Sequence, residues 1–92
     1  MYRGWKYLEG DWRYFCSSGA MVFNAWVQSG GEWYYIKDGA MLANSWLFGC
    51  YYLKSDGTMA CNETLYVKDP SLPFVTRYFY FNSEGIGRGL IL

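Results

Sequence analysis

The 92-residue sequence contains no histidine, only two prolines and few charged residues, which make up 17% of the chain. Without histidine, His-based catalytic triads, His general bases and the usual zinc ligand sets are excluded. Eight basic residues balance eight acidic ones. This zero net charge argues against a nucleic-acid partner, because such binding depends on neutralising phosphates. No apolar run approaches the roughly 18 residues that a membrane helix needs, so we expect no membrane insertion.

The three cysteines, Cys16, Cys50 and Cys61, form no Cys-x-x-Cys pair, so neither a zinc ribbon nor a thioredoxin-type motif is indicated. We interpret them as structural or incidental thiols. The alternative is a disulfide, for which Cys50–Cys61 is the one pair considered. Residues 1–5 lack the apolar segment of a secretory signal peptide. We predict no catalytic residue, no metal ligand and no cofactor.

Aromatic residues are abundant: 23% of the chain, with five Trp, ten Tyr and six Phe. They recur at regular intervals. A first Trp returns after 21 and then 20 residues, at Trp5, Trp26 and Trp46. A Gly-x-Met triplet closes each of the first three copies and begins at Gly19, Gly39 and Gly57. The aromatic segments 12–15, 33–36, 50–53 and 78–81 align as four copies. A period of about 20 residues predicts an array of stacked units.

Each copy is typical of an aromatic β-hairpin followed by a loop. A two-residue turn in the first copy pairs Tyr7 with Trp12. The Gly30-Gly31 turn of the second copy pairs Trp26 with Tyr35. Because side chains alternate along a strand, the partners in each pair share one face. In the third copy the connection is three residues shorter, so its register stays open.

An isolated hairpin is marginal in water, so these units must stack on one another. We therefore predict an all-β fold class, a solenoid of stacked β-hairpin repeats that forms a single module over residues 1–92. The predicted units are 4–23, 24–43, 44–62 and 63–92. The last unit is a degenerate cap, because Thr64 stands where a Trp is expected and two prolines lengthen its loop.

The sequence Gly-Trp, then Trp-Tyr-Tyr, then Gly-x-Met resembles the choline-binding, or cell-wall-binding, repeat of Gram-positive surface proteins, autolysins and phage lysins. The resemblance is carried by residues 4–21 and 26–41, and more weakly by 46–59. It implies a left-handed solenoid with ligand sites between consecutive repeats. In such a site, two Trp of one repeat, a Tyr or Trp of the next and a nearby Met form an aromatic box.

The residues of two boxes follow from this resemblance. The first box comprises Trp5 and Trp12, closed by Tyr35 or Trp26, with Met21 beside them. The second comprises Trp26 and Trp33, closed by Tyr52 or Trp46, with Met41 beside them. The pattern breaks at a third box, where Cys50 replaces the second Trp. The aromatics on the opposite hairpin faces are expected in the core: Tyr34, Tyr51 and Phe79.

A quaternary ammonium cannot donate a hydrogen bond, and aromatic faces attract its diffuse charge. We therefore expect a non-enzymatic module that binds choline or choline-bearing teichoic acid and anchors or targets an attached protein at the extracellular cell wall. One alternative is a carbohydrate-binding module, in which sugars stack on the same rings and polar neighbours such as Asn24 and Asn44 bond their hydroxyls. Another is a structural or oligomerisation module, a homodimer formed through the C-terminal hairpin and the tail at 89–92. Asp38 and Asp56 occupy equivalent turns and are interpreted as turn residues, not as paired catalytic acids.

Overall fold

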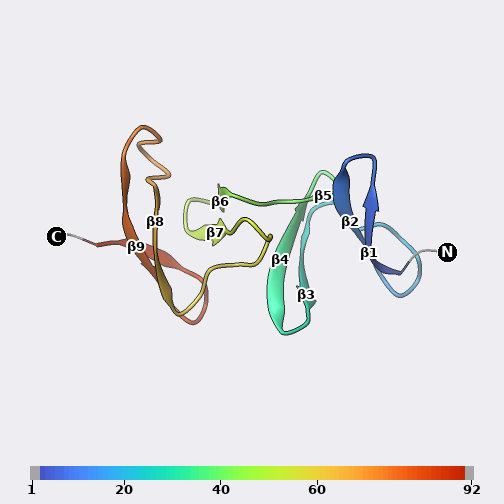
Figure 1. Ribbon diagram of the computed structural model, residues 1–92. Helices are drawn as coiled ribbons and strands as arrows, with labels where there is room; N and C mark the ends of the chain where they lie inside the picture. Colours follow the sequence, from blue (N-terminus) through green and yellow to red (C-terminus); the bar gives the residue numbers. More distant parts are fainter. Residues whose placement is uncertain (1–2, 91–92) are drawn as a thin grey trace.

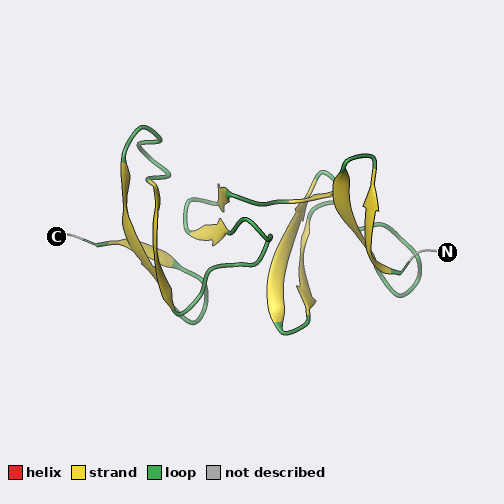
Figure 2. Ribbon diagram, in the orientation of Figure 1, coloured by secondary structure: helices red, strands yellow, loops and turns green. Residues whose placement is uncertain are grey.

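Ten short strands run through residues 3–90, the part of the chain that the computed structural model describes. No helix occurs among these residues, so none of them forms an apolar helix of membrane-spanning length (Figure 2). The start of the predicted module, residues 1–2, and the end of the predicted tail contact, residues 91–92, lie outside the described residues. The all-β class predicted from the sequence is confirmed.

The strands pair only with antiparallel neighbours and form four sheets that follow one another along the chain. These sheets are β1 (Gly4–Leu8) with β2 (Asp11–Phe15); β3 (Ala25–Ser29) with β4 (Glu32–Lys37) and β5 (Ala40–Met41); β6 (Ser45–Leu47) with β7 (Tyr51–Leu53); and β8 (Glu63–Lys68) with β9 (Thr76–Phe81) and β10 (Gly87–Gly89). We call the pairs β1–β2, β3–β4, β6–β7 and β8–β9 hairpins 1 to 4.

The hairpins stand side by side in chain order, so the molecule is elongated, with extents of 51 × 25 × 17 Å (Figure 1). Hairpins 1 and 4 lie at opposite ends of the row. An arrangement in which each unit touches mainly its sequence neighbours is that of a solenoid.

The registers of hairpins 1 and 2 are those that the turn residues predict. Tyr7 faces Trp12 in hairpin 1, and Trp26 faces Tyr35 in hairpin 2. In hairpin 3 the shorter connection turns through Phe48-Gly49, where φ is +54° and +72°. This tight loop places Trp46 opposite Tyr52, so a Trp and a Tyr again share one face as in the first two hairpins.

Neighbouring units approach closely where a methionine lies on a glycine. A Cβ atom built on Gly57 would lie 2.5 Å from Sδ of Met41, and one on Gly85 would lie 2.5 Å from Sδ of Met59. Both glycines also have φ near +85°, at +87° and +83°. Only glycine combines this backbone conformation with room for the thioether. The Gly-x-Met triplets therefore join consecutive repeats.

The buried core is spread along the row of hairpins and includes two clusters, Leu47 with Leu53 and Met59, and Ala60 with Phe79 and Phe81. Its three largest fully buried side chains are Ile36, Leu53 and Phe81. They occupy equivalent places in the aligned segments 33–36, 50–53 and 78–81. The second, third and fourth repeats thus each contribute one large, fully buried apolar side chain, whereas Phe15, the equivalent residue of the first repeat, is half-buried.

We expect Gly57→Ala to lower the free energy of unfolding by more than Gly10→Ala does. Both positions have positive φ, +87° and +84°, which costs an L-residue about 1–2 kcal/mol. Only at Gly57 does the new methyl meet Met41, because nothing lies within 4 Å at Gly10. Overpacking there adds about 1–3 kcal/mol. Urea unfolding followed by Trp fluorescence measures the difference, and equal losses would contradict the methionine contact.

Candidate functional site

A cavity of about 240 Å³ lies against hairpin 1; we call it cavity 1. Its lining residues are Trp5, Trp12, Met41 and Asp56. The two Trp side chains come from one face of the hairpin, and 45% of Trp12 is exposed. The ring of Tyr34 in hairpin 2 meets Trp5 edge-on, with centroids 5.0 Å apart. Tyr34 therefore fixes the position of one aromatic wall.

A second cavity of about 250 Å³, cavity 2, repeats this arrangement one hairpin further along. Its lining residues are Trp26, Trp33, Tyr51, Met59 and Glu84. The rings of Trp26 and Trp33 stand at 89° to each other, with centroids 6.4 Å apart. Tyr51 of hairpin 3 meets Trp26 edge-on at 5.2 Å. Three aromatic rings, a thioether and a carboxylate thus surround one space.

The tyrosines that contact the first Trp of each cavity from the next hairpin are Tyr34 and Tyr51, and of these only Tyr51 lines its cavity. The resemblance led us to expect Tyr35 or Trp26 at the first box and Tyr52 or Trp46 at the second. The reason for the difference is the way hairpins stack. A hairpin presents its Trp face to the next unit, and the next unit necessarily presents its opposite face in return. Adjacent residues of a strand point to opposite faces. The tyrosine on the Trp face of its own hairpin therefore points away from the preceding hairpin. The tyrosine next to it in the sequence contacts the Trp of that preceding hairpin.

The methionine at each cavity also comes from one repeat later than expected. Met41 lines cavity 1, where we predicted Met21, and Met59 lines cavity 2, where we predicted Met41. Met21 lies instead near Gly39, 3.3 Å from a Cβ built there. Each methionine lies just after its own hairpin in the sequence, so it contacts the Trp face of the preceding hairpin.

The other predicted closing residues line different hollows: Trp26 lines cavity 2, and Tyr35, Trp46 and Tyr52 line two grooves. Tyr35 packs on Trp26 within hairpin 2 and lines a groove together with Trp46. Trp46 and Tyr52 share one face of hairpin 3 and line a larger groove of about 770 Å³ beside the loop at 69–75. Neither residue lines cavity 2.

Between hairpins 3 and 4, aromatic rings pack against Trp46, while the groove of about 770 Å³ stays open beside the loop at 69–75. Trp46 meets Phe79 at 4.9 Å and Phe81 at 5.5 Å. Cys50 stands where Trp12 and Trp33 stand in earlier repeats, and its carbonyl accepts a hydrogen bond from the backbone N–H of Gly87 at 2.8 Å. Without a side chain at Gly87, the ring of Phe81 lies over that residue. The combination of a second Trp and a facing methionine is therefore absent from this interval in the described part of the chain.

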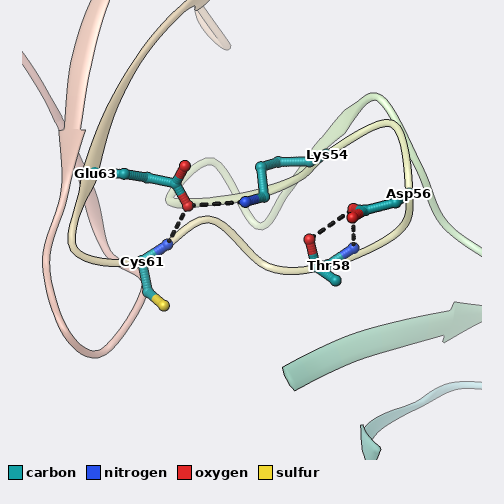
Figure 3. A network of polar contacts seen from close by, with 5 residues as sticks. All are labelled: Lys54, Asp56, Thr58, Cys61 and Glu63. Carbon is teal, nitrogen blue, oxygen red and sulfur yellow. Dashed lines mark hydrogen bonds and ion pairs between the residues drawn. The ribbon is translucent and has the colours of Figure 1, made fainter. Parts of the chain in front are cut away.

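The carboxylate of cavity 1 is held in the loop after hairpin 3. Oδ1 of Asp56 accepts hydrogen bonds from the hydroxyl of Thr58 at 2.6 Å and from its backbone N–H at 3.0 Å (Figure 3). These bonds lower the pKa of the Asp56 carboxyl below its ordinary value. In the same loop, Nζ of Lys54 donates to Glu63 at 3.0 Å, which raises the pKa of that lysine. The loop is thus tied at both ends, and Asp56 is ionised at neutral pH.

All three cysteines are free thiols, so the disulfide alternative Cys50–Cys61 is not formed. Residues 3–90 bring together no group of three Cys, Asp or Glu side chains able to hold a metal ion.

Comparison with known proteins gives consistent matches. A family model, the choline-binding repeat, matches residues 2–46. The structure resembles that of the modular autolysin LytC from Streptococcus pneumoniae, with a TM-score of 0.80 and 36% identity over 96% of this chain. It also resembles the choline-binding domain of Spr1274 from the same species, with a TM-score of 0.60 and 36% identity, covering 67% of this chain and 88% of that one.

Among curated proteins, glucosyltransferase-S of Streptococcus mutans is 29% identical over 83 residues, which cover 85% of this chain. The chain spans only 5% of that enzyme and 20% of LytC. The likeness to both proteins therefore concerns a small part of each.

We expect Thr58→Val to raise the pKa of Asp56 toward its ordinary value, because the strongest hydrogen bond to the carboxylate is lost. A depressed folded-state pKa contributes stability that is present above the unfolded-state pKa and is lost as the pH falls through the folded value. The variant should therefore lose less stability between neutral and acidic pH. A ¹³C NMR titration of the carboxyl group measures the pKa. Thr64→Val, at an exposed position of β8, is the control, and an unchanged pKa of Asp56 in Thr58→Val would contradict this account.

Proposed function

The chain belongs to the choline-binding repeat family, and we propose that cavities 1 and 2 each capture the trimethylammonium group of a choline. The observation that carries this proposal is that two separate cavities are built from the same parts. Each has two Trp from one hairpin and a methionine from the next unit. Each first Trp is also backed by a tyrosine across the interval.

The aromatic rings and the thioether of each cavity suit a quaternary ammonium ligand. Its methyl groups carry diffuse positive charge and cannot donate hydrogen bonds, so the electron-rich faces of aromatic rings are its natural partners. Each such contact is worth roughly 0.5–2 kcal/mol. Two or three faces then give about millimolar affinity for one site. Tight attachment requires several sites to act together on a surface that carries many choline groups.

The proposed natural partner is therefore a choline-bearing polymer such as the teichoic acid of a Gram-positive cell wall. In this role the chain is a non-enzymatic module that holds an attached protein at the extracellular surface. The match to a modular autolysin supports this assignment, because it places the same fold beside other parts of a longer protein.

We expect choline to change the Trp fluorescence of this chain with about millimolar affinity, and Trp33→Ala to weaken binding at cavity 2 by about tenfold or more. The indole of Trp33 is one wall of that cavity, and ~1.4 kcal/mol corresponds to a factor of ten. Because 39% of Trp33 is exposed, the β-type circular dichroism should persist.

Phe74→Ala is the matched control for that experiment. Phe74 is also aromatic and is 84% exposed, but it lies in the loop at 69–75, away from both cavities. Its loss should leave choline binding unchanged. If Trp33→Ala binds as the wild type does, Trp33 serves packing alone; if the wild type does not respond to choline, the proposed function is refuted.

Carbohydrate binding is a second candidate, favoured by the groove of about 770 Å³ beside hairpin 4. This groove combines the aromatic side chains of Trp46, Tyr52 and Tyr66 with polar Asn44 and Thr76. A sugar requires such a mixture, because its ring stacks on an aromatic face while its hydroxyls need hydrogen-bond partners. The partial match to a glucosyltransferase agrees with this candidate.

Titration with a glucan oligosaccharide tests the second candidate. If the groove binds the sugar, Tyr66→Ala should abolish the response while choline binding persists, because Tyr66 is exposed and lines neither cavity. Tyr7→Ala, another exposed tyrosine at the far end of the molecule, is the control. No response of the wild type to the oligosaccharide would eliminate this candidate.

A further inference from the structure

Each cavity has one carboxylate in its lining, and both carboxylates come from the same place in the repeat. Asp56 lines cavity 1 and directly precedes Gly57, while Glu84 lines cavity 2 and directly precedes Gly85. These are the two glycines on which Met41 and Met59 lie. The close glycine–methionine approach therefore brings an acidic side chain to the edge of each aromatic cavity.

The carboxylate comes from two hairpins beyond the Trp pair. In cavity 1, the Trp residues belong to hairpin 1, Met41 follows hairpin 2, and Asp56 follows hairpin 3. In cavity 2, every contribution moves on by one hairpin, and Glu84 follows hairpin 4. No other charged residue lines either cavity among the described residues. Each cavity is thus lined by residues from three consecutive repeats.

We propose that Asp56 and Glu84 make cavities 1 and 2 selective for cationic over neutral ligands, which rests on the proposed binding of choline. Aromatic rings and a thioether accept a trimethylammonium group and an uncharged tert-butyl group of the same shape by similar apolar contact. A carboxylate distinguishes the two, because its attraction depends on the ligand's charge.

Closing the turn explains the presence of Asp56 but not that of Glu84. Oδ1 of Asp56 caps its turn through Thr58. In the corresponding turn of the last repeat, however, Asn82 is the cap, since its Oδ1 accepts the backbone N–H groups of Glu84 and Ile86. The carboxylate of Glu84 is therefore not needed to close the turn, yet an acid still stands beside the cavity.

The charge of Asp56 is also available to a ligand. Lys54 is the neighbouring cation whose field acts on Asp56, but its ammonium group is ion-paired with Glu63 at 3.0 Å. Asp56 itself is exposed and forms no ion pair with Lys54. Its charge therefore acts on a ligand in cavity 1 through solvent, so we expect an effect of several-fold rather than of orders of magnitude.

The test uses Asp56→Asn and Glu84→Gln, which remove the charge and keep the shape. The amide oxygen of Asn can still accept both bonds from Thr58, so the turn is preserved. Two ligands are compared: choline and its neutral isostere 3,3-dimethylbutan-1-ol. Labelling with 5-fluorotryptophan and ¹⁹F NMR reports Trp5 and Trp12 separately from Trp26 and Trp33, so each cavity is titrated in the same sample.

Asp38→Asn is the matched control, because Asp38 precedes a glycine in the equivalent turn of an earlier repeat and lines neither cavity. We expect Asp56→Asn to weaken choline at cavity 1 by about threefold to tenfold and to leave cavity 2 unchanged. Glu84→Gln should do the reverse. Affinity for the neutral alcohol should not change in either variant, and the choline effect should shrink in high salt.

Choline binding by the wild type with equal affinity in Asp56→Asn and Glu84→Gln would overturn this inference and leave the proposed function standing. An equal loss for choline and for the neutral alcohol would also overturn it, since the carboxylates would then act on cavity shape. Absence of choline binding by the wild type would refute both the proposed function and the inference.

Discussion

The edge-on contact between a Trp of one hairpin and an aromatic ring of the next is the interaction on which this molecule depends. It recurs in all three intervals with nearly constant centroid distances, 5.0 Å for Trp5–Tyr34, 5.2 Å for Trp26–Tyr51 and 4.9 Å for Trp46–Phe79. Such pairs contribute about 0.5–1.5 kcal/mol beyond their buried area. Single hairpins are marginal in water, so this contact is what allows them to persist as a row.

Because these ring distances are nearly constant, the side chains beside the contact decide whether an interval holds a cavity lined by two Trp and a methionine. A second Trp on the turn side of the hairpin, with a methionine facing it, leaves a cavity between them. In the last interval Cys50 and Gly87 take these two positions, and the ring of Phe81 lies over Gly87. The first two intervals of the stack therefore contain cavities 1 and 2, whereas the third contains the packed rings of Phe79 and Phe81 beside the groove of about 770 Å³.

Much of this arrangement is predictable from the sequence, because it depends on local rules. The Gly30-Gly31 turn and the alternation of side chains suffice to place Trp26 opposite Tyr35, and the repeat period predicts the stacked β fold. The partners across an interval are harder to predict. Tyr34 rather than Tyr35 meets the preceding hairpin, because that choice depends on which face a whole hairpin turns toward its neighbour. Glu84 was missed because it belongs to the irregular last repeat; its place before a glycine, like that of Asp56, was the signal that could have revealed it.

Hairpin 2 takes part in both cavities. Its Tyr34 supports Trp5 of cavity 1 from one face, while its Trp26 and Trp33 form the walls of cavity 2 on the other. A guest that restrains this hairpin from one side reduces the motion left to be lost when a second guest arrives on the other side. If both cavities bind choline as proposed, any coupling between them through this shared hairpin must be reciprocal. Because hairpin 2 contributes to both, the two cavities are not structurally independent of each other.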